Sequence, residues 1–388
     1  MGRDRPRVLL VCSGLDHARR GYESFARECF EALHGDPGIE IELAKGSGPA
    51  GPGEHSVPTL RRDGVIAETL GDWLRFRPFR LEALVFAFSL QPLLMRRRPD
   101  VIYLSEWDTA RGLARLRSLT SHRFKLVLCN GGFAVRGFEH LDRVQELTPA
   151  ARDHVLELGA DPSRHTVLPL GFSIDPELRL LSADDRAALR RSLGLPVDRP
   201  IVVSVAALNR SHKRLDYLID ELAALPQPRP FALLVGEPDA ETPALRSLAA
   251  QRLGGDGHEF RTVAPGQVRE LLHASDLFVL ASLAEMQGRA AIEAMGEGLP
   301  CVVHDSPVMR FAVGEQGTLA HLQEPGALTL LLREGSVRGL DAAAARTRHR
   351  YVYDRFSWER LRPRYVQLLS EVARGDAPNS TVSSSTGE

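Results

Sequence analysis

The sequence predicts two successive α/β domains, each with a parallel sheet that carries helices on both faces. The chain has 388 residues, which suits two domains of roughly 100 to 200 residues each. Short β-branched and leucine-rich runs alternate with amphipathic helical segments, and a proline-bounded segment at 168–176 divides them into two series. Such alternation is typical of doubly wound parallel sheets.

The first series begins with a strand at residues 7–11, a loop and an amphipathic helix at 22–33. Similar units follow, because apolar runs with strand or helix periodicity recur. The further strands are expected at 100–104, 125–129 and 144–147, and the further helices at 109–119 and 150–158. We therefore expect an N-terminal Rossmann-like domain over residues 1–174.

The second series predicts a C-terminal Rossmann-like domain over residues 175–354. Its strands are expected at 201–205, 231–235, 259–263, 277–280 and 301–304, with helices near 215–225, 243–252, 267–274 and 289–296. A final helix is expected within 355–374 with Ser357 as N-cap. The Ser/Thr/Gly-rich tail 375–388 is expected to be disordered. Because ligands bind beyond the carboxyl ends of parallel strands, we expect the two domains to face each other across a cleft that holds the site.

Composition narrows the class of protein. The 49 basic and 50 acidic residues give a formal net charge of −1, which argues against a general nucleic-acid binder. Four scattered cysteines show no zinc-binding spacing, so we expect buried thiols, a reducing cytoplasmic location and no metal site. The longest apolar run, 81–95, contains Glu82 and is shorter than the roughly 20 residues of a membrane span, so no transmembrane segment is expected.

The arginine-rich stretch 75–98 has two interpretations. Its arginines are interleaved with aromatic residues, a pattern that suits docking on an anionic membrane. It also suits a core helix whose arginines extend toward water, and this second interpretation is favoured.

The most informative stretch is DLFVLASLAEMQGRAAIEAMGEGLP, at 276–300. A strand delivers Glu285 in a loop, and the following helix carries Glu293 eight residues later. The helix starts near Gln287, Gly288 and Arg289, where unpaired N–H groups and the positive end of the helix dipole favour a diphosphate. Carboxylates that accept bonds from sugar hydroxyls, beside amides for phosphate, suit a sugar nucleotide. Taken singly, each acid is more often a solvated surface residue.

Two further loops follow the first strand of each domain. In VSVAALNRSHKRLDYLI (203–219), Arg210 and Lys213 lie beyond a strand and are placed to neutralise a leaving diphosphate, although solvated cations that flank a helix start would look the same. Lysine occurs only three times in the chain, which favours a role for Lys213. In SGLDHARRGYESFARE (13–28), Gly21 opens a helix, and His17 and Arg20 are candidate acceptor ligands.

Weaker candidates follow other strands of the first half. Asn130 follows the predicted strand 125–129 and is a further acceptor candidate, although Asn-Gly is more often a turn. Glu106 and Asp108 follow the strand at 100–104. For these two acids a solvated loop is favoured over a catalytic role.

These motifs together resemble the retaining family 4 glycosyltransferases of the GT-B fold. The resemblance covers about residues 7–373 and rests on six motifs in the family's order. They are the E-x7-E pair followed by EAMGEGLPCVV, KRLDYLI, HASDLFVLAS, LTPAARDHVLELG, LPLGFSID and FSWERL. The resemblance implies a metal-independent, cofactor-free enzyme that moves a sugar from a nucleotide-diphosphate donor, most commonly a UDP-sugar, to a hydroxyl acceptor.

The resemblance also implies roles for individual residues. Glu285 would bind donor-sugar hydroxyls, Glu293 the ribose and Lys213 the diphosphate. The segment from Gln287 through Gly288 to Arg289 would meet sugar and phosphate with its amides, Val263 would meet the base through its backbone, and Gly21 would face the transferred sugar. The terminal helix would cross back to the first domain. The acceptor would be a small metabolite, a glycan or a lipid carrier.

Three positions depart from the family pattern. Ala207 and Leu208 stand where the family has an arginine, so Arg210 is the candidate replacement. Gln287 replaces an aromatic residue, and Asn130 stands where many members have a histidine. Other activities on this fold stay open: a sugar-nucleotide epimerase, a phosphorylase, or a nucleotide-sugar-binding protein without activity.

Overall fold

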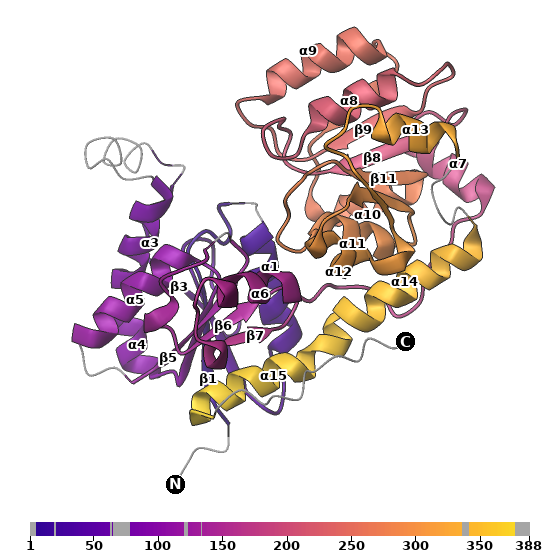
Figure 1. Cartoon of the computed structure of the whole chain (residues 1–388). Helices are drawn as coiled ribbons and strands as arrows, with labels where there is room; N and C mark the ends of the chain where they lie inside the picture. Colours follow the sequence, from indigo (N-terminus) through magenta and orange to yellow (C-terminus); the bar gives the residue numbers. More distant parts are fainter. Residues whose placement is uncertain are drawn as a thin grey trace. The chain divides into compact units, whose positions relative to one another are not determined.

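The computed structural model describes residues 5–18, 21–62, 64, 78–119, 123–132, 134–335 and 341–376. It divides the chain into two compact units (Figure 1). The N-terminal unit combines Met1–Ser173 with Trp358–Glu388, and the C-terminal unit spans Ile174–Ser357. Most of the tail that is expected to be disordered, from residue 377 on, lies outside the described residues.

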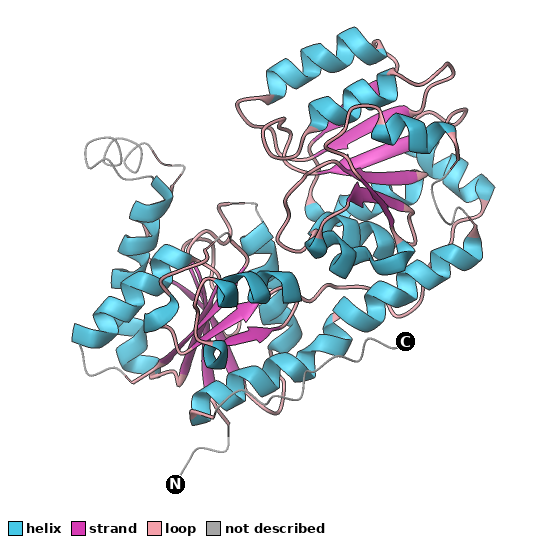
Figure 2. Ribbon diagram, in the orientation of Figure 1, coloured by secondary structure: helices cyan, strands magenta, loops and turns pink. Residues whose placement is uncertain are grey.

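The N-terminal unit is built on a seven-stranded parallel sheet in the order β3-β2-β1-β4-β5-β6-β7. Its strands are β1 Arg7–Cys12, β2 Glu40–Lys45, β3 Glu54–Ser56, β4 Val101–Leu104, β5 Lys125–Asn130, β6 Arg143–Glu146 and β7 His165–Val167. Its helices are α1 Gly21–Leu33, α3 Pro78–Ser89, α4 Gln91–Arg97, α5 Trp107–Leu119, α6 Pro149–Glu157, α15 Trp358–Arg374 and the short 3-10 turns η1 Phe138–His140 and η2 Pro162–Arg164. Helices cover both faces of the sheet (Figure 2).

The C-terminal unit is built on a six-stranded parallel sheet in the order β10-β9-β8-β11-β12-β13. Its strands are β8 Ile201–Val205, β9 Phe231–Val235, β10 His258–Arg261, β11 Leu277–Leu280, β12 Cys301–His304 and β13 Thr318–Ala320. Its helices are α7 Ala183–Ser192, α8 Leu215–Ala223, α9 Thr242–Leu253, α10 Pro265–Ala274, α11 Arg289–Gly296, α12 Pro307–Val313, η3 Gly314–Gln316, α13 Ala327–Arg333 and α14 Ala342–Phe356.

The expected central strands and the edge strand β10 are present, while β2 and the edge strands β3, β7 and β13 were not predicted. Strand β2 escaped prediction because its charged residues interrupt the apolar pattern; the structure pairs the buried Lys45 with Asp16 and Glu54. Strand β10 ends at Arg261 rather than at Val263. Each sheet buries an apolar core, one beneath α3 and α5 and the other beneath α8 and α9.

The last helix, α15, packs within the N-terminal unit. Its Tyr365 hydroxyl donates to the Pro169 carbonyl at 2.8 Å and accepts from Gln145 at 2.9 Å. The Trp358 and Phe25 rings stack with their centroids 6.1 Å apart. Buried aromatic contacts of this kind are strong anchors. The terminal helix therefore belongs to the first domain, although 184 residues of the second domain (174–357) precede it.

The apolar run near residue 90 forms α3 and α4. Among the described residues, the stretch Pro78–Arg97 is the one helical segment long and apolar enough to cross a bilayer on length and composition, so the expectation of no such segment was too strict. Phe86, Ala87, Leu90 and Leu94 of this stretch are nevertheless buried in the core of the N-terminal domain. This packing agrees with the core-helix interpretation of the stretch.

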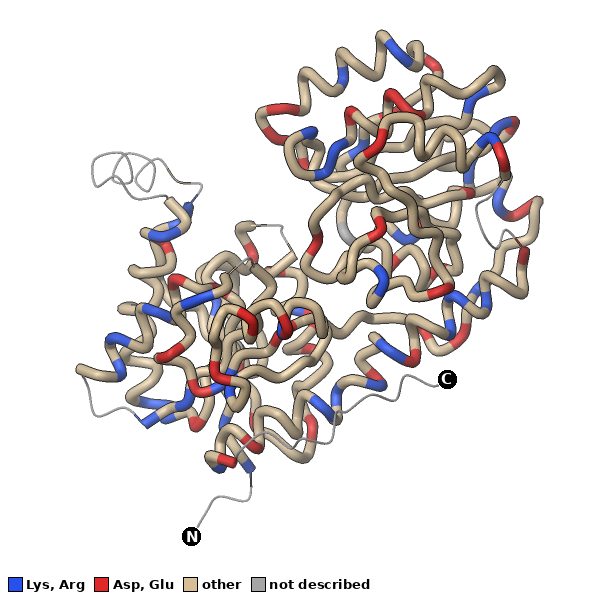
Figure 3. Tube along the Cα trace, viewed as in Figure 1, with Lys and Arg blue, Asp and Glu red and all other residues tan. Residues whose placement is uncertain are grey.

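The distribution of charged residues and the burial of the cysteines are those expected from the composition. Basic and acidic residues are interspersed along the described chain of both domains (Figure 3). The four cysteines are buried free thiols, and burial raises the pKa of Cys29 well above its usual value.

Candidate functional site

In each sheet the strand order reverses at one point, and the loops on either side of that point carry candidate residues. In the N-terminal sheet the reversal lies between β1 and β4, and in the C-terminal sheet it lies between β8 and β11. Loops that follow the strands on either side of such a reversal form the usual ligand crevice of open α/β sheets. The loops after β8 and β11 carry Lys213 and Glu285, and the loops after β1 and β4 carry His17 and Glu106.

The structure brings Lys213 and Glu285 into direct contact. The Lys213 ammonium Nζ lies 2.5 Å from Glu285 Oε1, and the two side chains are 16% and 12% exposed. The loop that carries the lysine is held by Asn209, whose Oδ1 accepts the Lys213 backbone N–H at 2.8 Å. His212 adds a second link between the two loops, because its Nε2 lies 3.1 Å from the Ala284 carbonyl oxygen. Asn209 and His212 were not singled out from the sequence, since polar loop residues are common without a role.

Arg210 lies in the same loop but takes other partners. Its guanidinium is 3.5 Å from Asp216 in the first turn of α8, and its side chain is 60% exposed. Its backbone N–H donates to Glu241 Oε2 at 2.7 Å. In this arrangement Arg210 pairs with an acid of its own loop and helix, whereas Lys213 is the cation that contacts Glu285.

Helix α11 begins directly after Gly288, which has φ +73° and offers no side chain to cap the helix. A Cβ on Gly288 would lie 2.7 Å from Met309 Cε, so the backbone here is closely packed. Gln287 is buried. Arg289 donates to Glu293 Oε1 at 3.1 Å, which holds that partly exposed carboxylate on the first turns of the helix. The two acids of the E-x7-E pair therefore each contact a cation.

Val263, the residue expected to meet the base, follows a strand that is not adjacent to β11, the strand before Glu285. It lies in the loop between β10 and α10, and β10 is the edge strand of the C-terminal sheet. Two strands, β9 and β8, lie between β10 and β11.

The acceptor candidates of the N-terminal domain are mostly engaged in internal contacts. The side chain of His17 is 1% exposed and lies between Ser47, at 3.2 Å from Nδ1, and Glu82, at 3.2 Å from Nε2. Asn130 is buried and donates to Glu146 and to the Ala134 carbonyl, both at 3.0 Å. Gly21 is the exposed first residue of α1. Arg20 lies outside the described residues.

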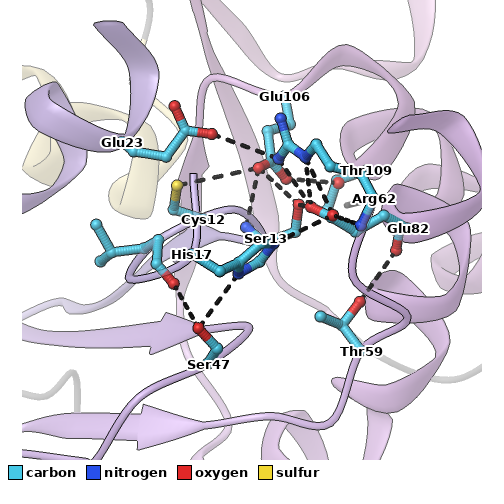
Figure 4. A network of polar contacts seen from close by, with 11 residues as sticks. Cys12, Ser13, His17, Glu23, Ser47, Thr59, Arg62, Glu82, Glu106 and Thr109 are labelled. Carbon is cyan, nitrogen blue, oxygen red and sulfur yellow. Dashed lines mark hydrogen bonds and ion pairs between the residues drawn. The ribbon is translucent and has the colours of Figure 1, made fainter. Parts of the chain in front are cut away.

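The expectation of a solvated Glu106 was wrong. Glu106 is 2% exposed and belongs to a buried polar network that also contains Ser13, Arg62 and Glu82 (Figure 4). Arg62 binds Glu82 with its backbone N–H and guanidinium, at 2.7 and 2.8 Å. Sequence reasoning noted Glu82 only as an interruption of an apolar run. An acid in an apolar helix that must find a buried partner was the available signal.

The two acids of this network differ in their electrostatics. Burial opposes the ionisation of Glu82, but hydrogen bonds from Arg62 and Ser13 outweigh it and hold the pKa of Glu82 below its usual value. For Glu106, burial dominates over its hydrogen bonds from Ser13 and Thr109, so its pKa is raised.

Among the described residues, no group of three or more His, Cys, Asp or Glu is placed to hold a metal ion.

Comparison with known proteins points to one family. Residues 185–331 match the family described as glycosyl transferases group 1. The D-inositol 3-phosphate glycosyltransferase of Streptomyces scabiei is 33% identical over 187 residues, which cover 45% of this chain and 41% of the relative. The protein of the same description from Mycobacterium bovis is 31% identical over 236 residues, which cover 57% of this chain and 47% of the relative. The chain thus spans somewhat less than half the length of these curated relatives.

Solved structures extend the likeness to nearly the whole chain. A sucrose-phosphate synthase from Thermosynechococcus elongatus has a TM-score of 0.76 at 19% identity, with 96% of this chain and all of that chain covered. The Anabaena protein HepE, solved with UDP and glucose, has a TM-score of 0.72 at 18% identity, with 95% and 100% covered. The expected GT-B architecture of two doubly wound domains is thereby confirmed.

Proposed function

We propose that this chain, which has the GT-B fold, is a group 1 glycosyl transferase that moves a sugar from a nucleotide-diphosphate donor to a hydroxyl acceptor. The observation that carries the proposal is the contact of Lys213 with Glu285 at the strand-order reversal of the C-terminal sheet. The donor binds the C-terminal domain at this point, and the acceptor binds the N-terminal domain. A UDP-sugar is the first donor to test, since HepE was solved with UDP-glucose.

The donor's charged and polar parts each find a matching group. The ammonium of Lys213 and the N–H groups at the start of α11 take the diphosphate, because a helix N-terminus attracts anions. Glu285 accepts hydrogen bonds from the sugar hydroxyls, and Glu293 from the ribose. Val263 meets the base through its backbone, and Gly21 faces the transferred sugar. Arg210 has a secondary role as a cation near the diphosphate, because its guanidinium is largely solvated.

The reaction proceeds with retention and without a metal ion. The glycosidic bond to the leaving phosphate lengthens first, and positive charge develops on the sugar. Lys213 and the dipole of α11 stabilise the negative charge that develops on the diphosphate. An oxygen of the leaving phosphate takes the proton of the acceptor hydroxyl as that hydroxyl attacks the same face of the sugar. Positioning and electrostatics supply most of the acceleration.

The relatives that share this chain's sequence suggest a class of acceptor. D-inositol 3-phosphate glycosyltransferases are 31% and 33% identical to this chain over the matched segments, so a phosphorylated cyclitol is the first acceptor to test. Glycans and lipid carriers follow. Because the side chains of His17 and Asn130 are buried and hydrogen-bonded, they shape the acceptor side of the N-terminal domain from beneath its surface. The buried free thiols agree with a reducing, cytoplasmic setting.

A thermal-shift screen against nucleotide sugars tests the donor half of this proposal. A ligand at 100 times its dissociation constant stabilises the folded state by about 2.7 kcal/mol. A UDP-sugar should stabilise the wild type and a Lys125→Ala control by similar amounts, and Lys213→Ala clearly less. Stabilisation that is equal in all three proteins would refute the donor site.

Turnover experiments separate transfer from its alternatives. Incubation of the donor alone should leave its sugar unchanged, whereas an epimerase would convert it without an acceptor. Addition of inositol phosphate should release nucleoside diphosphate and form a glycoside with retained anomeric configuration. Donor binding without transfer to any acceptor in a broad panel would identify a binding protein instead.

A further inference from the structure

The hydroxyl of Ser13 lies between two carboxyl groups. Ser13 Oγ is 2.7 Å from Glu82 Oε1 and 2.8 Å from Glu106 Oε1, and all three residues are buried (Figure 4). Both distances are hydrogen-bond distances between oxygen atoms. A serine hydroxyl has one hydrogen to donate, and an ionised carboxylate has none. With both acids ionised, one of the two contacts would therefore contain no hydrogen at all.

We propose that Glu106 is a neutral carboxylic acid in the folded protein, and that its proton positions the loop 13–18. In this arrangement Glu106 donates to Ser13 Oγ, and Ser13 donates in turn to the ionised Glu82. Glu106 Oε1 keeps a lone pair for the Ser13 backbone N–H, at 2.9 Å, and Oε2 accepts from Thr109 at 2.8 Å. Every contact of the two acids then contains a hydrogen.

The partners of each acid decide which of the two holds the proton. Glu82 faces the guanidinium and backbone N–H of Arg62 and the ring of His17, so it is surrounded by donors and suits a carboxylate. Among the described residues, the hydrogen-bond partners of Glu106 are uncharged groups of Cys12, Ser13 and Thr109, and no cation is in direct contact with it. Burial of a carboxyl group without a paired cation favours its neutral form.

The groups packed around Glu106 reinforce this assignment. Cys12, Ser13 and Thr109 contact it directly, and Tyr22 and Arg62 interact with it electrostatically. Glu82, Glu23 and His17 belong to the same network through Ser13 and Arg62 or through Glu82 itself. The guanidinium of Arg62 is shared by Glu82, at 2.8 Å, and Glu23, at 3.4 Å. Ionised Glu106 would add a third carboxylate around one guanidinium. The raised pKa of Glu106, caused mainly by burial, agrees with this count.

The proton matters because it acts on the start of the loop 13–18. Ser13 is held by its backbone and its side chain, and His17 is held through the same Glu82. Within the loop, the N–H groups of His17 and Ala18 turn back to the Gly14 carbonyl, at 3.3 and 2.8 Å. Glu106 is thus a positioning residue. That Glu106 is protonated follows from these contacts alone. That the proton affects catalysis depends also on the proposed transfer, in which this loop lies on the acceptor side.

Carbon-13 NMR of glutamate-labelled protein tests the proton without any substrate. At pH 7 one glutamate carboxyl carbon should appear at the position of a neutral acid and should titrate only at higher pH. That resonance should vanish in Glu106→Gln and persist in Glu31→Gln, a control on the exposed face of α1. Ser13→Ala removes the hydroxyl that joins the two acids. In this variant Glu106 should therefore ionise at a lower pH than in the wild type. A wild type whose glutamates are all ionised at pH 7 would overturn the proposal, as would a resonance that survives Glu106→Gln.

The pH profile of transfer tests the positioning role. In the wild type, kcat/KM should fall at least several-fold as the pH rises through the titration seen by NMR, because ionised Glu106 no longer donates to Ser13. Glu106→Gln should lack this alkaline fall, with kcat changed more than the donor KM. An unchanged alkaline fall in Glu106→Gln would refute the positioning role. Failure to detect any transfer would count against the proposed function and would leave the NMR result to judge the proton.

Discussion

The Lys213 ammonium and the Glu285 carboxylate lie 2.5 Å apart, although 72 residues separate them in the chain. The contact joins the loops after β8 and β11, on either side of the point where the strand order of the C-terminal sheet reverses. Both side chains are largely buried, so the pair is preorganised rather than a chance surface contact. A diphosphate that binds here meets an ammonium that Glu285 already orients.

Lys213→Ala should reduce kcat/KM for the donor by roughly 10- to 100-fold, since a charge-assisted contact contributes about 1.5 to 3 kcal/mol. The melting temperature should also fall, because Glu285, whose side chain is 12% exposed, loses its paired cation. Lys125→Ala, which removes an exposed lysine from β5, is the control and should keep full turnover. Equal kinetics in the two variants would contradict the role of Lys213.

Gly288→Ala should weaken donor binding beyond its effect on stability. Gly288 has φ +73°, and a Cβ would lie 2.7 Å from Met309 Cε and Sδ. Gly194→Ala is a matched control in the same domain, with φ +68° and no atom within 4 Å of the added Cβ. Both variants should lose about 1 to 2 kcal/mol from the left-handed backbone. Only Gly288→Ala should also raise the donor Kd in calorimetry, because its added methyl group lies next to the first N–H groups of α11.

Glu293→Gln should raise the donor KM several-fold and leave kcat nearly unchanged, since a ribose contact is the same in ground and transition states. Arg289 loses its carboxylate partner in this variant. The exposed Glu315 supplies the control Glu315→Gln. A fall in kcat at constant KM would instead place Glu293 at the reacting sugar.

The N-terminal domain should lose stability in acid through Glu54. Burial alone would raise the pKa of Glu54, but hydrogen bonds from Lys45 and Arg27 outweigh it and lower the pKa to about 2. The unfolded value is about 4.3. A lowered folded pKa means that this contribution is complete above pH of about 4.3 and is lost progressively as the pH falls toward 2.

Tryptophan fluorescence measures this effect in one domain, because Trp73, Trp107 and Trp358 all belong to the N-terminal unit. Glu54→Gln should lower the denaturant midpoint at pH 7 by an amount equivalent to about 1 to 3 kcal/mol. Its midpoint should then fall less steeply than that of the wild type below pH of about 4.3. The exposed Glu157→Gln should follow the wild type at every pH. A wild-type slope in Glu54→Gln would show that another acid is responsible.

The sequence predicted what periodicity and strand-end motifs encode. The apolar runs of β1, β4, β8 and β11 are buried central strands, and their hydrophobic patterns are unambiguous. The order of Lys213, Glu285 and Glu293 after these strands was enough to expect the two loops of the C-terminal site. Strand β2, which lies between β3 and β1, was missed because charged residues interrupt it and partners from other loops neutralise those charges. The edge strands β3, β7 and β13 were missed because each has only three residues, too few for a periodic pattern.

The N-terminal network could not be predicted from spacing. Ser13, Arg62, Glu82 and Glu106 come from four separate parts of the chain, and no local pattern links them. Glu106 looks like a loop acid until the fold buries it against Ser13 and Thr109. Arg210 was a candidate beside Lys213, with the lysine favoured, and the geometry pairs Arg210 with Asp216.

A crystal structure of the protein with a bound nucleoside diphosphate would locate the donor site. The two phosphates should contact the ammonium of Lys213 and the backbone N–H groups at the start of α11, while Glu293 should accept a hydrogen bond from the ribose. A diphosphate that is bound elsewhere, with Lys213 and Glu285 still paired to each other alone, would contradict this assignment of the donor site.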